Sequence, residues 1–386
     1  MTDIIIAGIG QTPVGEHWDI SLRSLALQAI QAAIQDSGGL KPQALFVGNM
    51  LSAAISRQGQ LGTLLADYAG LTGIEAESVE VGGASGAAAL RHGFMAIASG
   101  MVDVALVVGV EKFTDVIGPD LEAALATQTD ADFEAVHGLT LSAQAALLAR
   151  RYIFENQVPS DGLAGFPMTA HFNGAGNANA MYRKAIALEA YQKAEQVSDP
   201  LNIYDIAPNA DGAAALVLIR RELLPQGLPH PMVRVTASAV ASDTLTLAER
   251  SDLLSFTAVQ SSTDAALQKA DLTREQIDLF EYYDAFSIFA ALSLEAAGYA
   301  KRGMGWKFAN EGSISLTGQI PCATMGGLKA RGNPGGATGV YQAVEAALQL
   351  RGQAEKNQIS GAQHALIQSL GGPASVSITH VLQTMA

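Results

Sequence analysis

Val81-Gly82-Gly83-Ala84-Ser85-Gly86 and Gly332-Asn333-Pro334-Gly335-Gly336-Ala337-Thr338-Gly339 are two glycine-rich segments, and each leads into an apolar, alanine-rich stretch with helical spacing. A glycine turn before a helix brings backbone N–H groups and the positive end of the helix dipole close to a ligand. Such turns can hold a thioester or an oxyanion. Neither segment contains a cysteine or a histidine, so chemistry at these turns must use other side chains.

The composition indicates a compact chain with a large core. Of its 386 residues, 49% are apolar and 16% are charged, which allows two similar halves and argues against disorder. The net charge of −14 disfavours nucleic acid and anionic membranes as partners, whereas a local basic patch can still bind a phosphate-bearing cofactor. The single cysteine, Cys322, excludes an internal disulfide, and the N-terminal residues show no targeting pattern. We therefore expect a soluble, cytoplasmic protein with no membrane span.

Apolar runs alternate with helical patterns along the chain, which predicts an α/β fold. The predicted strands cover residues 4–8, 44–47, 102–108, 209–218, 277–282 and 365–369. The predicted helices cover residues 21–36, 84–99, 256–270 and 336–351. Residues 265–272 echo residues 32–39, and each copy precedes a strand, a glycine turn and a buried helix, which indicates a weak internal duplication. Buried helices between sheets predict more layers than an ordinary doubly wound fold has.

The order of the predicted elements divides the chain into two halves, residues 1–222 and 223–386. Between about residues 115 and 200 the sequence is richer in polar and aromatic residues than the segments on either side. This stretch predicts a subdomain of loops and helices that is inserted into the first half and lies over it.

Several motifs follow one another in a characteristic order. They include Gly8-Ile9-Gly10-Gln11-Thr12-Pro13, Gly109-Val110-Glu111-Lys112 and Gly326-Gly327-Leu328-Lys329. In this order they resemble the thiolase superfamily, and within it the sterol-carrier-protein type of thiolase, over nearly the whole chain. The resemblance implies a five-layered αβαβα thiolase fold with two pseudo-symmetric halves. It also implies a CoA thioester as substrate, no bound cofactor, and a homodimer, with which the apolar residues 79–90 are compatible.

The residues at the family's four chemical positions are replaced in this chain. Gly83 stands where the family has its nucleophilic cysteine, and the following Ala-Ser-Gly is retained. Tyr283-Asp284-Ala285-Phe286 stands where the family has His-Asp-Cys-Phe, and Asn333 stands where it has the histidine of Gly-His-Pro. Thiolytic cleavage needs an acyl-enzyme and therefore a nucleophile such as a thiolate. The resemblance thus implies a scaffold that binds a thioester but lacks the covalent machinery.

Retro-aldol cleavage of a β-hydroxyacyl-CoA needs no acyl-enzyme, and it is the first functional hypothesis. In it Asn333 donates a hydrogen bond to the enolate oxygen, and Tyr283 exchanges a proton with the hydroxyl or the enolate carbon. Gly83 would leave space for a branched β-carbon. Because the pKa of a tyrosine is normally near 10, Tyr283 needs a helix dipole or a donor partner to act as a base. The alternative, purely structural interpretation is that Tyr283 is a packed aromatic side chain and that Asp284 and Asn333 stabilise turns.

The Tyr-Asp segment also resembles the thiolase-like aldolases of steroid side-chain degradation, which pair with a small protein that has an OB-fold and a zinc ribbon. A branched or sterol-like acyl-CoA and such a partner are therefore expected, and no metal site is expected in this chain because its histidines show no ligand spacing. The candidate catalytic residues are Tyr283, Asn333, Gly83, Ser85 and Asp284. The candidate residues for substrate and CoA binding are His171, Arg183, Lys184, Phe286, Met325, Gly336 and Gly339.

Two other functions fit the same residues. The chain can be a non-catalytic pseudo-thiolase subunit of an acyltransferase complex, or an acetyl-CoA acyltransferase with an unrecognised nucleophile. Ser85 is the candidate nucleophile, although no histidine stands nearby in its motif, and Cys322 is interpreted as a small apolar filler. Turnover that depends on Tyr283 would favour the lyase. Normal assembly without CoA binding would favour the pseudo-thiolase, and a covalent acyl group on Ser85 would favour the acyltransferase.

Overall fold

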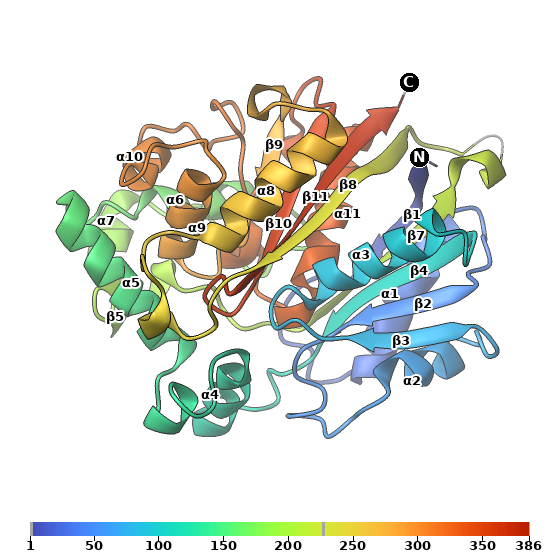
Figure 1. The fold of residues 1–386 in the computed structure, drawn as a ribbon, viewed down its shortest axis with the longest axis horizontal. Helices are drawn as coiled ribbons and strands as arrows, with labels where there is room; N and C mark the ends of the chain where they lie inside the picture. The colour runs from blue at the N-terminus through green and yellow to red at the C-terminus, as the bar shows by residue number, and fades with distance from the viewer. Residues whose placement is uncertain (1–2, 226–227, 386) are drawn as a thin grey trace.

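Nine strands form one continuous sheet in the part of the chain that the computed structural model describes, residues 3–225 and 228–385 (Figure 1). The strand order is β3-β2-β4-β7-β1-β8-β11-β10-β9. The first half of the sheet contains β1 (Ile4–Gln11), β2 (Ala44–Gly48), β3 (Glu75–Val79), β4 (Val104–Glu111) and β7 (Gly212–Arg220). The second half contains β8 (Met232–Ser242), β9 (Leu279–Glu281), β10 (His364–Gly371) and β11 (Val376–Met385). The two halves join where Ile5 and Ile6 of β1 pair with Arg234 and Val233 of β8.

Helices cover both outer faces of the sheet and also fill the space between its halves. Helices α1 (Leu22–Asp36) and α2 (Leu61–Tyr68) pack on the outer face of the first half, and α8 (Thr257–Ala270) packs on that of the second. Helices α3 (Ser85–Ala98) and α11 (Thr338–Arg351) lie between the two halves. The layers therefore run α-β-α-β-α, and the predicted five-layered thiolase fold is confirmed.

The two central helices approach each other closely because both carry small residues. A Cβ atom on Gly339 of α11 would lie 2.2 Å from the backbone nitrogen of Ala87 in α3. The Ala87 carbonyl lies 3.0 Å from Nε2 of His380 in β11. On the other side, the Tyr341 hydroxyl of α11 donates to the carbonyl of Thr12, just after β1, at 3.0 Å. The central layer is thus tied to both halves of the sheet.

The inserted stretch mostly covers the second half, so the expectation that it lies over the first half is wrong. It contains α4 (Pro119–Leu125), α5 (Leu141–Asn156), α6 (Gly165–Gly174), α7 (Leu188–Gln192), β5 (Gln196–Ser198) and β6 (Leu201–Asn202). Helices α5 and α6 pack against α9 (Ser287–Ala296), and α6 also packs against α10 (Gly305–Asn310). The reason is that residues 287–294 of α9 are all buried, so this apolar helix needs a cover on every side. Helix α4 packs on the first half, beside Leu51 and Phe113.

The region that we expected at a dimer interface lies largely inside the chain. Residues 82–90 are buried because they form the turn before α3 and the first part of that central helix. Strand β3, just before them, lies at the edge of the sheet and is mostly exposed. Among residues 3–225 and 228–385 no helix is both long enough and apolar enough to cross a lipid bilayer.

Candidate active site

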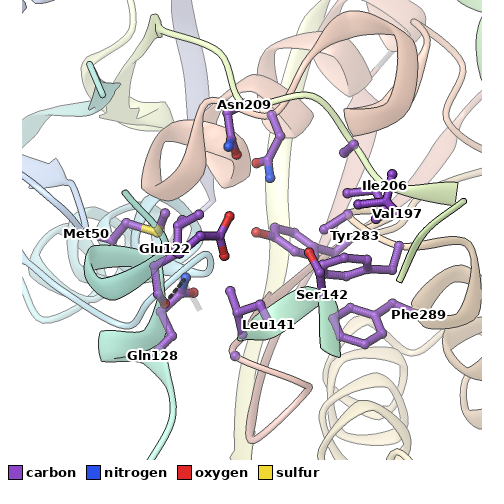
Figure 2. A pocket seen from close by; sticks show the side chains of 16 residues that line it. Met50, Glu122, Gln128, Leu141, Ser142, Val197, Ile206, Asn209, Tyr283 and Phe289 are labelled. Carbon is purple, nitrogen blue, oxygen red and sulfur yellow. Dashed lines mark hydrogen bonds between the residues drawn. The ribbon is translucent and has the colours of Figure 1, made fainter. Parts of the chain in front are cut away.

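Two adjacent pockets lie where the inserted stretch meets both halves of the molecule. The small pocket has a volume of about 180 Å³, and Tyr283, Phe286 and Asn333 are among the residues that line it (Figure 2). The large pocket has a volume of about 1120 Å³, and Arg183 and Lys184 line it. The two pockets share a wall formed by Val197, Ile206, Ala207 and Asn209. The two pockets are therefore immediate neighbours.

The Tyr283 hydroxyl fills the space beside Gly83. A Cβ atom on Gly83 would lie 2.2 Å from the Tyr283 Oη and 2.8 Å from the Leu370 carbonyl oxygen. The expectation that Gly83 leaves space for a substrate carbon is therefore wrong, because the phenol already occupies that space. Burial, together with the nearby Asp284 and Glu111 carboxylates, raises the pKa of Tyr283 far above its ordinary value of 10.0. Tyr283 is held as a neutral phenol, which suits a proton donor better than a base.

The backbone N–H of Gly83 is already hydrogen-bonded. It donates to Oε1 of Gln128 at 2.7 Å. Gln128 ends the short turn η1 (Ala126–Gln128), directly after α4, and its side chain reaches the glycine turn from the inserted stretch. A backbone N–H at such a turn is the group that would stabilise the oxyanion of a covalent intermediate. Because Gln128 accepts the hydrogen bond of the Gly83 N–H, this N–H is not available to an oxyanion.

Neither the Ser85 hydroxyl nor the Cys322 thiol lines either pocket. The Ser85 hydroxyl is fully buried, donates to the Gly82 carbonyl at 2.6 Å and accepts from the Val81 N–H at 2.9 Å. Ser85 thus closes the glycine turn. The Cys322 thiol is buried in the core and donates to the Ile320 carbonyl at 3.2 Å. Burial raises the pKa of the Cys322 thiol well above its ordinary value, so it stays an inert, protonated thiol.

Two asparagines stand side by side at the small pocket. Asn333 and Asn209 form an isolated parallel bridge, and both line the pocket. The Asn333 Oδ1 accepts from the N–H of Gly335 at 3.1 Å, which orients the amide. Within residues 3–225 and 228–385 the Asn333 Nδ2 has no hydrogen-bond partner. This amide can therefore donate to a carbonyl or enolate oxygen in the pocket.

The large pocket carries the predicted basic residues. Arg183 and Lys184 line it together with His171, whose ring stacks on Tyr182 at a centroid distance of 5.9 Å. Burial lowers the pKa of His171, so this ring is neutral near pH 7. Lys329 also lines the pocket, and its Nζ donates to the Asp205 carbonyl oxygen at 2.7 Å. Burial lowers the pKa of Lys329 to about 8, although nearby acidic side chains oppose this shift.

Several candidate residues support the turns and line neither pocket. Asp284 accepts from the Leu328 N–H at 2.7 Å and thereby holds the π-helical turn Gly327–Arg331. The Gly336 N–H donates to the buried carboxylate of Glu111 at 3.1 Å. Met325 accepts from the Asn357 side chain at 3.8 Å through its sulfur, and Gly336 and Gly339 lie close to the backbone of neighbouring segments, so their role in substrate binding stays a prediction. The candidate residues that line neither pocket are Gly83, Ser85, Asp284, Met325, Gly336 and Gly339.

Four residues that sequence reasoning missed line the pockets: Glu122, Gln128, Asn209 and Lys329. Glu122 belongs to α4, and Figure 2 shows its carboxylate pointing toward the Tyr283 hydroxyl. Lys329 stands in a quoted motif and could have been found there. Glu122 and Gln128 lie in the inserted stretch, where no motif marks them. Within the described ranges, no group of three or more His, Cys, Asp and Glu side chains could hold a metal ion.

The five layers, with a glycine turn at the start of each central helix, are typical of the thiolase fold. The family models described as "Thiolase, N-terminal domain" and "Thiolase C-terminal domain-like" match residues 4–222 and 239–384. An acetyl-CoA acetyltransferase of Methanothermobacter thermautotrophicus is 38% identical over 99% of each chain. The chain therefore belongs to the thiolase family.

Relatives with other names are also similar. A 17-hydroxy-3-oxo-4-pregnene-20-carboxyl-CoA lyase of Mycobacterium tuberculosis is 27% identical over 94% of this chain and 95% of the lyase. A solved structure named "Ltp2-ChsH2(DUF35) aldolase" has a TM-score of 0.84 and 25% identity, and the match covers 99% of this chain and 98% of that chain. The family thus includes similar chains named as acyltransferases and as carbon–carbon lyases.

Proposed function

We propose that this protein cleaves or forms a carbon–carbon bond in an acyl-CoA thioester by a retro-aldol type of reaction, without an acyl-enzyme. The observation that carries the proposal is the position of Tyr283. Its phenol takes the space that a side chain at Gly83 would need, and Gln128 takes the N–H of Gly83. The turn therefore offers neither a nucleophile nor a vacant place for one.

The large pocket supports CoA as the carrier of the acyl group. Its volume of about 1120 Å³ is large enough for a ligand of cofactor size, and Arg183 and Lys184 can pair with phosphate groups. A pantetheine arm that passes the shared wall at Ile206 and Asn209 would bring the thioester to the small pocket. No bound cofactor is needed in this proposal, because the thioester itself stabilises the carbanion.

The reaction proceeds at the small pocket in two stages, cleavage of the carbon–carbon bond and protonation of the enolate. A base removes the proton of the β-hydroxyl, a C=O bond forms at the β-carbon, and the bond between the α- and β-carbons breaks. Its electron pair forms an enolate, whose oxygen accepts a hydrogen bond from the Asn333 Nδ2. The Tyr283 phenol then donates its proton to the α-carbon. The products are a shorter acyl-CoA and an aldehyde or ketone.

The names of the relatives support two further parts of the proposal. The name Ltp2-ChsH2(DUF35) joins the similar aldolase to a DUF35 protein, which supports a small OB-fold and zinc-ribbon protein as a partner here. Thiolase-family chains are commonly oligomers, and we propose a homodimer. The acetyl-CoA acetyltransferase relative favours an acyltransferase as the second candidate function.

The test incubates the purified protein with β-hydroxyacyl-CoAs and β-ketoacyl-CoAs of short, branched and sterol-like chains, with and without free CoA. We expect β-hydroxyacyl-CoA to be cleaved without free CoA, and Tyr283→Phe to lower the rate by about 100-fold or more. Tyr282→Phe is the control, because this neighbouring tyrosine is buried but lines neither pocket. Cleavage of β-ketoacyl-CoA that requires free CoA, with a trapped acyl-enzyme, would instead establish the acyltransferase.

A further inference from the structure

Helix α4 carries one carboxylate into the small pocket. Leu121 and Ala124 anchor α4 on the first half by packing with Leu51 and Phe113. Glu122 stands between these two anchors, lines the small pocket and points at the Tyr283 hydroxyl (Figure 2). Within residues 3–225 and 228–385 its carboxylate accepts no hydrogen bond and forms no ion pair. In the first turn of α4 this carboxylate interacts favourably with the helix dipole, and it remains free to bond a ligand in the pocket.

We propose that Glu122 is the catalytic base that removes the proton of the substrate's β-hydroxyl group. This assignment rests on the function proposed above. Among the described residues that line the small pocket, Glu122 is the carboxylate and Tyr283 is the other group that can titrate. The remaining polar side chains there are Gln128, Ser142, Asn209 and Asn333. None of these amides and hydroxyls is a base near neutral pH.

The two titratable groups divide the proton transfers between them. Tyr283 is buried and held as a neutral phenol, so it can give a proton but cannot take one first. Glu122 is half-buried, and burial raises its pKa above the ordinary value of 4.5, which brings a carboxylate closer to the pKa of an effective base. Gln128 from the neighbouring turn and Tyr283 from the second half face Glu122 across the pocket. Neither of them adds a full charge near neutral pH.

The cycle closes without any further reactant besides water. Glu122 takes the hydroxyl proton, the O–H electron pair forms the new C=O bond, and the electron pair of the broken carbon–carbon bond forms the enolate. Tyr283 donates its proton to the α-carbon and becomes a phenolate. Glu122 then releases its proton to water and the Tyr283 phenolate takes up a proton from water, which restores both groups. Carbon–carbon bond formation uses the same steps in reverse.

The test compares the wild-type protein with Glu122→Gln, using a β-hydroxyacyl-CoA that the wild type cleaves. We expect kcat to fall by about 100-fold or more with little change in KM, because a neutral amide cannot accept the proton. For the wild type, kcat/KM rises with pH through the raised pKa of Glu122, and this acid limb disappears in Glu122→Gln. Glu122→Asp is expected to keep the limb at an intermediate rate.

Asp120→Asn is the matched control, because Asp120 is an exposed carboxylate in the same turn of α4 and lines neither pocket. Its rate and pH profile should equal those of the wild type. If the wild type cleaves the substrate and Glu122→Gln does so at the same rate with the same pH profile, the role of Glu122 is refuted and the proposed function stands. If the wild type cleaves no β-hydroxyacyl-CoA, both are refuted.

Discussion

At the scale of single residues, the site depends on how Gly83 and Tyr283 pack: the Tyr283 side chain occupies the space that a side chain at position 83 would need. The glycine has no side chain, and the tyrosine hydroxyl stands where a Cβ atom would project, at 2.2 Å. Behind the turn, the Leu370 carbonyl oxygen lies 2.8 Å from the same point and belongs to a strand of the sheet. A side chain at position 83 would therefore clash with the Tyr283 phenol, which can rotate away, and with the Leu370 carbonyl, which cannot move because it belongs to the sheet.

We expect Gly83→Ala to destabilise the protein by about 1–3 kcal/mol, because overpacking forces side chains from their rotamers. The activity should fall as well, since Tyr283 must leave its place. Chemical denaturation measures the change, with Gly59→Ala as the control because the space around Gly59 is open. In Gly83→Ala/Tyr283→Phe, part of the loss should be recovered. Equal stability of Gly83→Ala and Gly59→Ala would refute the steric argument.

At the scale of secondary-structure elements, one carboxylate links three segments around the glycine turns. Glu111, the last residue of β4, accepts from the Asn49 side chain at 2.8 Å and from the Met50 and Leu51 N–H groups at 2.9 and 3.2 Å. It also accepts from the N–H of Gly336 at 3.1 Å, just before α11. The end of β4, the loop after β2 and the start of α11 are thereby held together.

The pKa of Glu111 predicts how this link responds to pH. Burial raises the pKa of Glu111 from 4.5 to about 7, so between these values the folded protein keeps a proton that the unfolded chain has lost. Its contribution to stability is therefore full below pH 4.5 and is lost as the pH rises through 7. Between pH 5 and 8 the unfolding free energy of the wild type should fall by about 3 kcal/mol relative to that of Glu111→Gln. Urea denaturation at each pH measures it, and a difference that does not change with pH would refute the prediction.

The sequence predicted the elements that have a clear hydrophobic period. Helices α1, α3, α8 and α11 and six of the strands of the sheet lie within a few residues of the ranges expected from apolar spacing. Strands β3, β8 and β11 were missed. Strand β3 is short and mostly exposed at the edge of the sheet, and polar residues interrupt the apolar pattern of β8 and β11. In β11, Ser377, Thr379 and His380 are buried and bond to partners on α8 and α3. Such long-range hydrogen bonds leave no periodic signal.

The same distinction applies to the site. Gly83, Tyr283 and Asn333 were expected together because each replaces a residue of a known motif. In the structure Tyr283 lies against Gly83, and Tyr283 and Asn333 line the small pocket. Glu122 and Gln128 come from a different stretch, whose position depends on how α4 packs on the first half. They share a pocket with Tyr283 only through tertiary packing, which sequence spacing cannot predict.

At the scale of the whole molecule, an acidic chain gathers positive charge in one place. The net charge is −14, yet Arg183, Lys184 and Lys329 all line the large pocket. Since like charges elsewhere repel an anionic ligand, this local group is what would hold the phosphates of CoA. The inserted stretch provides two of these residues, so it contributes to both pockets.

Replacing Arg183 and Lys184 together by alanine should raise the Kd for CoA about tenfold or more, because two charge-assisted contacts are lost. The dependence of binding on salt should become weaker in the same variant. Isothermal titration at low and high salt measures both effects, with pantetheine as a ligand that lacks the nucleotide phosphates and should bind unchanged. Lys193→Ala, an exposed change directly after α7 and outside both pockets, is the matched control. A double variant that binds CoA like this control would show that the phosphates bind elsewhere.

The contacts among Gly83, Tyr283 and Gln128 have a consequence for engineering a nucleophile at this turn. A Gly83→Cys substitution would bring its Cβ atom to 2.2 Å from the Tyr283 oxygen, and the N–H of residue 83 would still be bonded to Gln128. Replacing Tyr283 alone would open the space and still leave no nucleophile at position 83. A thiol can therefore be installed here only together with changes at positions 283 and 128.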